Sequence, residues 1–357
     1  MKKRKRKPVK KLLAAILLQL SLLVILIFSC KSLYQMLLTS QSSPDRLTPN
    51  NQHVRESTEK TEEEKAPSVT EAISSYGIAE KDKDNAKPAE GGKLLTVDLK
   101  AKQLASKSAV LVRLNDQKLL LNKSSDTAIY PASLTKIMTA IVAIENLDDL
   151  NKTIPLPSSM FQKLYDENAS MAGFLPDETV PAIDLLYGVI LPSGAECCIG
   201  LSDYIAGSED AFVALMNDKA QALNMNHTHF TNSTGLNDPD HYTTVEDLAL
   251  LLEYALQNDT FREIFTSPRH STQPSSRHPG GITFISTLFE NLASPEFDGG
   301  TILGGKTGYT SEAGLCLASL AEKDGEEYIL VTAGADGNHD TEQFNISDAL
   351  MVYNSLE

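Results

Sequence analysis

Residues 130–140 have the sequence YPASLTKIMTA, in which a serine and a lysine three positions apart precede an apolar run. Residues three apart share one face of a helix, so the pattern places the Ser133 hydroxyl beside the Lys136 amine. A serine is a weak nucleophile without an adjacent base, and a lysine is such a base when burial or a nearby cation lowers its pKa. The alternative is a chance pattern with Lys136 on a solvated helix face.

Two further motifs follow this pair along the chain. Residues 193–195 are SGA, and residues 304–310 are GGKTGYT. An S-x-x-K pair, a central S-x-N-like element and K-T-G, in this order, form the signature set of penicillin-binding proteins and related β-lactamases. Each motif alone is weak evidence, whereas the ordered set is specific.

The sequence resembles a low-molecular-mass penicillin-binding protein, that is, a serine-type D-alanyl-D-alanine carboxypeptidase. The resemblance extends from about residue 95 to the end of the sequence. It includes PASLTK at 131–136, TNSTGL at 231–236, HYTT at 241–244 and KTGYTSEAG at 306–314. It implies removal of the terminal D-Ala from peptidoglycan stem pentapeptides through an acyl-enzyme, with β-lactam antibiotics as covalent inhibitors. Neither a cofactor nor a metal is expected.

The resemblance assigns roles to the side chains of these motifs. Ser133 is the nucleophile, Lys136 is its base, and Ser193 relays a proton to the leaving D-alanine. Lys306 and Thr307 bind the terminal carboxylate of the substrate. A second ammonium group at Lys306 also disfavours protonation of Lys136. Without the resemblance, Lys306 is interpreted as an ordinary exposed lysine on a strand.

Two further roles concern the backbone. Gly308 has no Cβ, so it lets a substrate backbone approach the strand closely. The resemblance implies that the backbone N–H groups of Ser133 and Tyr309 form the oxyanion hole. Loss of one such donor typically lowers the rate by about a hundredfold or more.

The central motif departs from the family pattern at position 195. The usual S-x-N has asparagine there, and this chain has Ala195, which cannot donate a hydrogen bond to the acyl side of a substrate. Glu196 is not a simple substitute, because neighbouring helical residues point about 100° apart. A competing interpretation of Ser193 is that it caps a helix beginning near Glu196. The departure bears on substrate affinity and penicillin reactivity more than on the reaction class.

The N-terminal region predicts a membrane anchor. Residues 1–11 contain eight lysines and arginines and no acid, and residues 12–29 are almost continuously apolar. An apolar helix of about 20 residues spans a bilayer, and its basic flank stays in the cytoplasm. A cleaved signal peptide and a lipoprotein signal ending at Cys30 are the alternatives. The expected parts are a cytoplasmic flank at 1–11, a single transmembrane signal-anchor at 12–30, a flexible extracytoplasmic linker at 31–93 and a catalytic domain at 94–357.

The charge distribution argues against nucleic-acid partners. The formal net charge is −15, from 32 basic and 47 acidic residues, and without the basic flank it becomes −23. A body this acidic is repelled by nucleic acids and by anionic lipid headgroups. Attachment to the cell membrane is therefore expected to come from the apolar segment.

Neither the cysteines nor the histidines form a metal-binding pattern. No zinc or disulfide spacing connects the four cysteines, which are Cys30, Cys197, Cys198 and Cys316. Cys197 and Cys198 are best interpreted as small buried residues of a helix, with a cysteine–histidine nucleophile as the less favoured alternative. No metal site is expected either from the cluster of His227, His229, Asp238, Asp240 and His241.

The folded region predicts an α+β protein. Strands are expected at 95–101, 108–113, 118–122, 304–309, 315–321 and 328–333. Helices are expected at 132–145, 182–191, 196–206, 209–223, 244–257, 259–265 and 341–356, with a loop at 266–281. Strands at both ends predict one antiparallel sheet built from N- and C-terminal segments, flanked by helices and with an inserted helical lobe. A ligand site is expected in the cleft between the two.

Two other functions compete with the carboxypeptidase. A β-lactamase needs an additional acidic residue to activate water, in a motif that cannot be placed in this sequence. A non-catalytic wall-binding module with a degenerate site is supported by Ala195 alone.

Overall fold

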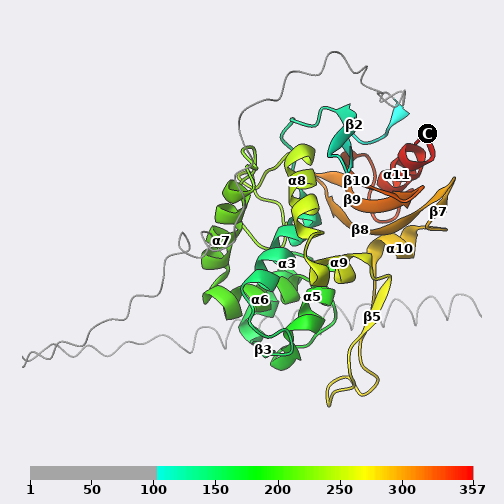
Figure 1. Ribbon diagram of the computed structural model, residues 1–357. Helices are drawn as coiled ribbons and strands as arrows, with labels where there is room; N and C mark the ends of the chain where they lie inside the picture. Colours follow the sequence, from blue (N-terminus) through cyan, green and yellow to red (C-terminus); the bar gives the residue numbers. More distant parts are fainter. Residues whose placement is uncertain (1–102, 357) are drawn as a thin grey trace, which may run out of the picture. The chain divides into compact units, whose positions relative to one another are not determined.

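The computed structural model describes residues 103–356, whose centre is a six-stranded antiparallel sheet of order β2-β1-β10-β9-β8-β7. The strands are β1 (Ser108–Arg113), β2 (Lys118–Lys123), β7 (Glu296–Phe297), β8 (Gly300–Thr310), β9 (Gly314–Lys323) and β10 (Glu326–Ala335). Strand β1 pairs with β2 on one side and with β10 on the other. Segments from both ends of the described region therefore build one sheet, which confirms the predicted α+β class (Figure 1).

A two-residue turn fixes the register of β9 and β10. Asp324 and Gly325 have φ values of 54° and 81°, and the residues flanking them, Lys323 and Glu326, are directly paired. Positive φ at both central positions matches the right-handed twist of the strands, and Asp-Gly adopts this conformation readily. This local sequence therefore sets the turn between β9 and β10.

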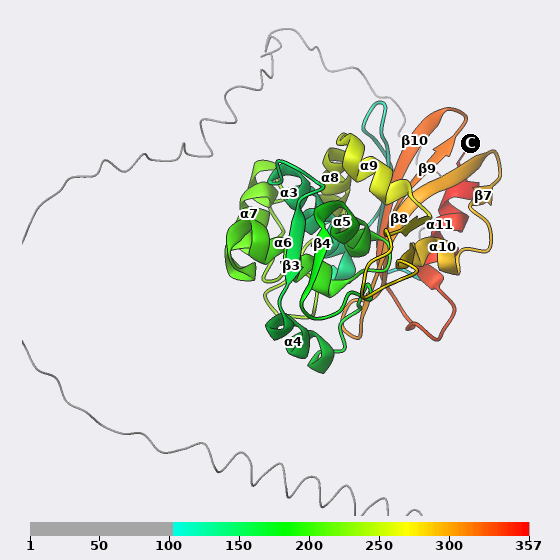
Figure 2. The same ribbon diagram turned by 90° about the horizontal axis from the view of Figure 1, so that it is seen from below.

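Helices cover both faces of the sheet. Along β10, Ile329 and Val331 belong to one apolar core and Leu330 to the other, as the alternation of a strand requires. On the first face lie α8 (Val245–Ala255) and α9 (Asp259–Thr266), and on the second lie α10 (Thr287–Asn291) and α11 (Phe344–Asn354). Figure 2 shows the sheet between these two sets of helices.

The remaining helices form a lobe around α3 (Thr135–Glu145), whose residues from Thr135 to Ile144 are all buried. Helix α3 packs against α5, α6 and α7 of the lobe and also against α8 and α9. The lobe contains β3 (Thr153–Leu156), α4 (Phe161–Asp166), β4 (Glu178–Pro181), α5 (Ala182–Ile190), α6 (Ala195–Ala206) and α7 (Glu209–Ala222). The predicted helical insertion is confirmed, and its central helix is the one that carries the serine–lysine pair.

Side-chain caps set where three of these helices begin. Ser208, Thr244 and Asn258 precede α7, α8 and α9, and each accepts a hydrogen bond from a backbone N–H three residues later. Such caps satisfy backbone donors that have no partner within the helix.

Two local predictions need correction. The loop predicted at 266–281 contains β5 (Arg269–Ser271), which pairs with β6 (Thr283–Ile285) in a hairpin that projects from the body in Figure 1. Strands of three residues are too short to show a period of two in the sequence. The helix predicted to begin at residue 132 begins instead with the 3₁₀ turn η2 (Ala132–Leu134).

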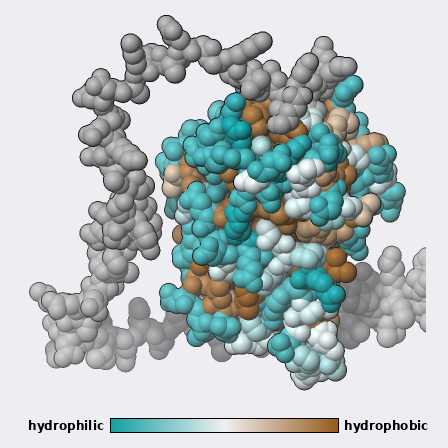
Figure 3. Space-filling model, turned by 45° about the vertical axis from the view of Figure 1, so that its right-hand side comes forward, coloured by the Kyte–Doolittle hydropathy of each residue, from teal (hydrophilic) through white to brown (hydrophobic). Residues whose placement is uncertain are grey.

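The predictions for 1–11, 12–30, 31–93 and the strand at 95–101 concern residues outside the described ones. Within residues 103–356, no helix has both the length and the apolar character that a membrane span requires. Hydrophilic residues cover most of the face seen in Figure 3, and apolar residues occur there in small separate groups. Most large apolar side chains of the described region lie in the two cores instead.

Candidate active site

Ser133 lies in the tight turn η2, directly before α3. Its neighbour Ala132 has a φ of 49°, in the left-handed region that residues with a Cβ rarely adopt. The turn is supported by Gly235, where an added Cβ would lie 1.9 Å from the Ala132 carbonyl oxygen. The serine is therefore presented by a strained turn that requires glycine on a segment about a hundred residues downstream.

Lys136 contacts the serine as the sequence spacing predicts. Its Nζ donates hydrogen bonds to Ser133 Oγ at 3.2 Å and to the carbonyl oxygen of Thr234 at 2.5 Å. Only 2% of the lysine is exposed, and burial lowers the pKa of its ammonium group, because a low dielectric disfavours the charged form. Burial therefore increases the fraction of Lys136 in the neutral form that a base requires.

Strand β8 brings the K-T-G motif to the serine. A Cβ atom at Gly308 would lie 3.1 Å from Ser133 N and 3.3 Å from Ala132 Cβ, so the strand and the turn are in close contact. Lys306 is fully buried, and burial together with the charge of Lys136 lowers its pKa well below the ordinary value. The two lysines are therefore electrostatically coupled, although Lys306 is buried rather than exposed.

A cavity of about 360 Å³ opens at the serine. It is lined by Ser133, Ser170, Pro192, Ser193, Thr287, Glu290, Asn291, Thr307, Gly308, Tyr309, Leu315, His339, Gln343 and Asn345. The Thr307 hydroxyl is bonded to that of Thr287 at 2.6 Å, and the Tyr309 ring packs edge-on against His339. Residues from all three sequence motifs thus meet around one cavity, while Lys306 lies behind its surface.

Ser193 does not cap the helix that follows it, so this competing interpretation is wrong. The N-cap of α6 is Gly194, and no side chain bonds to that helix end. Ser193 has a φ of 67°, and its buried Oγ has no hydrogen-bond partner among the described residues. A buried hydroxyl without a partner is costly, so this atom is available to a ligand in the cavity.

The turn at residues 231–236 holds Lys136 in place. Asn232 Oδ1 accepts hydrogen bonds from the backbone N–H groups of Thr234 and Gly235, and its Nδ2 donates to the Leu236 carbonyl oxygen. The same turn positions the Thr234 carbonyl oxygen against Lys136. The TNSTGL match in the sequence is therefore part of the structure that holds Lys136 beside Ser133.

His241 supports the start of α3. The backbone N–H of Thr231 donates to its Nδ1 at 3.0 Å, so Nε2 carries the proton and donates to Thr135 Oγ1 at 2.8 Å. Burial lowers the pKa of this histidine to about 4. His241 is thus a neutral residue that is hydrogen-bonded to Thr135, two positions after Ser133. Its residue type alone did not indicate this structural role.

The cysteines are poor nucleophiles in this environment. Cys197, Cys198 and Cys316 are buried free thiols. Burial raises the pKa of Cys198 to about 12 and that of Cys316 to about 11, and it raises that of Cys197 as well. None of the three lines the cavity.

Comparison with known proteins agrees with the sequence motifs. A family model described as D-alanyl-D-alanine carboxypeptidase, peptidase family S11, matches residues 96–337. The chain belongs to this family. The resemblance inferred from the motifs is therefore confirmed for the family as a whole.

Curated members of the carboxypeptidase family are similar over part of their length. D-alanyl-D-alanine carboxypeptidase DacF of Bacillus subtilis is 32% identical over 234 residues, which cover 64% of this chain and 57% of the relative. DacC of Escherichia coli is 30% identical over 261 residues, covering 71% of this chain and 62% of the relative. The chain thus matches about three fifths of the length of these relatives.

Solved structures show the same fold. The Streptomyces K15 DD-transpeptidase has a TM-score of 0.63 at 24% identity, covering 71% of this chain and 97% of that structure. A D-alanyl-D-alanine carboxypeptidase from Mycobacterium tuberculosis has a TM-score of 0.60 at 25% identity, covering 70% and 90% respectively.

Several residues of the site were not indicated by the sequence. Ser170 and Thr287 line the cavity, and Glu209 accepts hydrogen bonds from both the N–H and the hydroxyl of Ser233. None of the three belongs to a family motif quoted above. Their positions depend on which segments pack together, and no local pattern reports that.

Proposed function

We propose that this chain is a membrane-anchored serine D-alanyl-D-alanine carboxypeptidase that removes the terminal D-Ala of peptidoglycan stem pentapeptides. The observation that carries the proposal is the contact of Lys136 Nζ with Ser133 Oγ, in a cavity that Ser193 and Thr307 also line. Membership of the family and the names of the relatives support the substrate class.

Acylation begins with transfer of the Ser133 proton to the neutral amine of Lys136, while Oγ bonds to the carbonyl carbon of the penultimate D-Ala. The negative charge that develops on the carbonyl oxygen is stabilised by the backbone N–H groups of Ser133 and Tyr309. The C–N bond then breaks, and the leaving amine takes up the proton from Lys136 through the hydroxyl of Ser193.

Binding and deacylation complete the cycle. Thr307, supported by Lys306 behind it, binds the carboxylate of the substrate, and Gly308 leaves room for the peptide backbone. Water then hydrolyses the Ser133 ester and returns the serine proton. β-Lactam antibiotics acylate the same hydroxyl and act as covalent inhibitors.

The cellular location forms part of the proposal. Residues 12–30 anchor the chain in the cell membrane by a single span, with the catalytic domain on the extracytoplasmic side, where peptidoglycan lies. The apolar composition of that segment and its basic flank support this arrangement. Protease treatment of intact spheroplasts should digest the catalytic domain, whereas protection of that domain would contradict the proposed orientation.

The function is tested with the full chain in detergent. The expected results are release of D-alanine from a peptide ending in D-Ala-D-Ala and a long-lived penicillin adduct that mass spectrometry locates on Ser133. Rapid turnover of penicillin without an adduct would identify a β-lactamase instead. Absence of both D-alanine release and adduct would leave the wall-binding alternative.

A further inference from the structure

The cavity wall near position 195 lacks the polar group that the family pattern has there. Ala195 is buried, and its methyl group is not among the groups that line the cavity. A different residue, Ser170, lines this region together with Ser193. The Ser170 side chain is exposed, and its hydroxyl has no hydrogen-bond partner among the described residues, so it is available to a ligand.

Ser170 is tied directly to the motif. The backbone N–H of Ala195 donates a hydrogen bond of 2.7 Å to the carbonyl oxygen of Ser170. The backbone thus connects the residue that lacks a polar side chain to a residue that has one. The hydroxyl on this side of the cavity therefore comes from Ser170 and not from a residue of α6.

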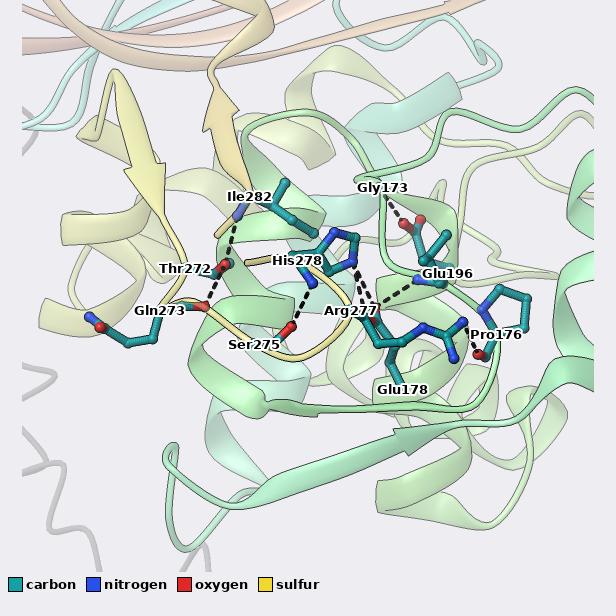
Figure 4. Close-up of polar contacts among 11 residues, drawn as sticks. Gly173, Pro176, Glu178, Glu196, Thr272, Gln273, Ser275, Arg277, His278 and Ile282 are labelled. Atoms are coloured by element: carbon teal, nitrogen blue, oxygen red, sulfur yellow. Dashed lines mark hydrogen bonds and ion pairs between the residues drawn. The ribbon is translucent and has the colours of Figure 1, made fainter. Parts of the chain in front are cut away.

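Glu196 holds the rest of this loop. Its Oε1 accepts hydrogen bonds from the backbone N–H of Ala172 at 2.7 Å and of Gly173 at 2.9 Å. Figure 4 shows the Glu196 carboxyl group pointing toward Gly173. Together with the Ala195 bond, these contacts attach the segment 170–173 to the first turn of α6.

The burial of Glu196 indicates that this residue fixes the position of the loop 170–173. The residue is fully buried, its Oε2 has no hydrogen-bond partner among the described residues, and burial raises its pKa. A Cβ atom at position 194 would lie 3.0 Å from this oxygen and 2.6 Å from Ala172 Cβ, so the loop, the carboxyl group and the turn are closely packed. Burying a carboxyl group with an unpaired oxygen costs free energy. The hydrogen bonds that the other oxygen accepts fix the position of the loop.

A second carboxylate braces the other end of the same loop. Glu178 accepts a hydrogen bond of 2.8 Å from the Leu175 N–H, and it also contacts His278 Nε2 at 3.1 Å. Arg277 lies beside His278 in the loop between β5 and β6, and it approaches the Pro176 carbonyl oxygen, as Figure 4 shows. The segment that carries Ser170 is therefore held from two directions.

We propose that the Ser170 hydroxyl hydrogen-bonds the acyl side of the substrate in place of the missing side-chain amide at position 195, and that Glu196 is the residue that positions it. This inference rests on the proposed carboxypeptidase function, because it names the group that contacts the substrate of that reaction. Ser170 binds substrate directly, whereas Glu196 acts through the loop.

The first test compares Ser170→Ala with Ser170→Thr and with Ser158→Ala, which removes an exposed hydroxyl outside the cavity. Loss of a single neutral hydrogen bond lowers kcat/KM for a D-Ala-D-Ala peptide by about tenfold. The threonine variant keeps the hydroxyl and should retain most of the activity, and the Ser158 variant should match the wild type. Equal kcat/KM for Ser170→Ala and the wild type would overturn the role of Ser170.

The second test separates positioning from general stability. Glu196→Gln keeps an acceptor for the two N–H groups and should stay near wild-type activity, whereas Glu196→Ala should raise KM by about tenfold. In the Glu196→Ala background, Ser170→Ala should add little further loss, because the hydroxyl is already displaced. Fully additive losses would overturn the positioning role, whatever happens to the melting temperature.

The rate of penicillin acylation keeps the two proposals distinguishable. If the wild type releases D-alanine and Ser170→Ala is unaffected, this inference fails and the carboxypeptidase remains. If the wild type neither releases D-alanine nor forms a penicillin adduct, both fail. If an adduct forms without D-alanine release, the carboxypeptidase fails, and a Ser170→Ala variant that is acylated at the wild-type rate then overturns this inference too.

Discussion

Two walls border the cavity, one formed by β8 and the other by the turn before α6 together with the loop 170–173. Different interactions hold the two walls in place. On one wall, β8 is held by a backbone ladder with β9 that is regular from Gly304 to Thr310, in which Lys306 pairs with Ala318 and Tyr309 with Leu315. On the other wall, the turn before α6 is bound to the loop 170–173 by the backbone bond from Ala195 to Ser170 and by the carboxyl group of Glu196. The first wall keeps the family motif, while the second departs from it at Ala195.

This difference has a physical reason. A strand within a sheet is positioned by many backbone hydrogen bonds that do not depend on side chains. Because the strand is fixed, the groups that contact the substrate on this wall must come from its own motif residues. A loop held by side chains can present a hydroxyl from a neighbouring segment when one motif position changes. Variants that act on one wall at a time therefore distinguish a fixed wall from an adaptable one.

The largest effect is expected where the two walls meet. Ser133→Ala removes the nucleophile, so D-alanine release should fall by at least about a thousandfold, since loss of a nucleophile is among the most severe catalytic substitutions. Mass spectrometry after penicillin treatment should show no adduct, while Ser158→Ala should keep the adduct. An adduct on Ser133→Ala would place the nucleophile elsewhere.

The sheet wall should respond next most strongly. Gly308→Ala adds a Cβ 3.1 Å from Ser133 N, which crowds the expected oxyanion site, so kcat/KM should fall by about a hundredfold. Gly280→Ala is the matched control, because a Cβ there meets no atom within 4 Å. A Gly308→Ala enzyme with the activity of the control would show that this close approach does not limit the reaction.

His241, beneath the serine turn, should make stability sensitive to acid. Its folded-state pKa of about 4 lies below the ordinary 6.5, so the unfolded chain takes up the proton first as the pH falls. The contribution is complete above about pH 6.5 and is lost as the pH falls toward 4. It amounts to about 2 kcal/mol between pH 7 and pH 5.

Urea unfolding at several pH values measures this loss. His241→Gln preserves one donor and one acceptor but does not titrate, so its free energy of unfolding should show a shallower dependence on pH. Parallel curves for the variant and the wild type would assign the acid sensitivity to other groups.

The smallest expected effect is a shift of the pH–rate profile. Because burial lowers the Lys136 pKa from its ordinary value of 10.5, acylation should rise by about tenfold per pH unit and level off below that value. The rise follows from the neutral amine being the base. In His241→Gln the rising limb should stay in place, and its displacement would assign the titration to the histidine.

Much of the site could be predicted because it is local. The contact between Ser133 and Lys136 follows from helical spacing, which places residues three apart on one face. The family resemblance that the three motifs carry predicted that the strand with Lys306 and Thr307 reaches the serine. By contrast, Lys306 is buried rather than lining the cavity, and Ser193 does not cap α6, because these features depend on packing around the motif.

The contribution of the helical-lobe wall could not be predicted in the same way. Ser170 and Ala195 are 25 residues apart, and His278 and Glu178 are 100 residues apart. No periodicity or spacing connects such pairs, and the strands of the hairpin carrying His278 are too short to be recognised.

The sequence alone determined the motif residues that meet at the cavity, the fold class and the family, because each depends on short-range spacing or on the order of motifs. The tertiary structure decided the protonation environment of the two lysines and of His241, since desolvation depends on which segments cover a side chain. It also decided which hydroxyl lines the cavity beside Ala195, because that depends on how a distant loop is bound to the start of α6.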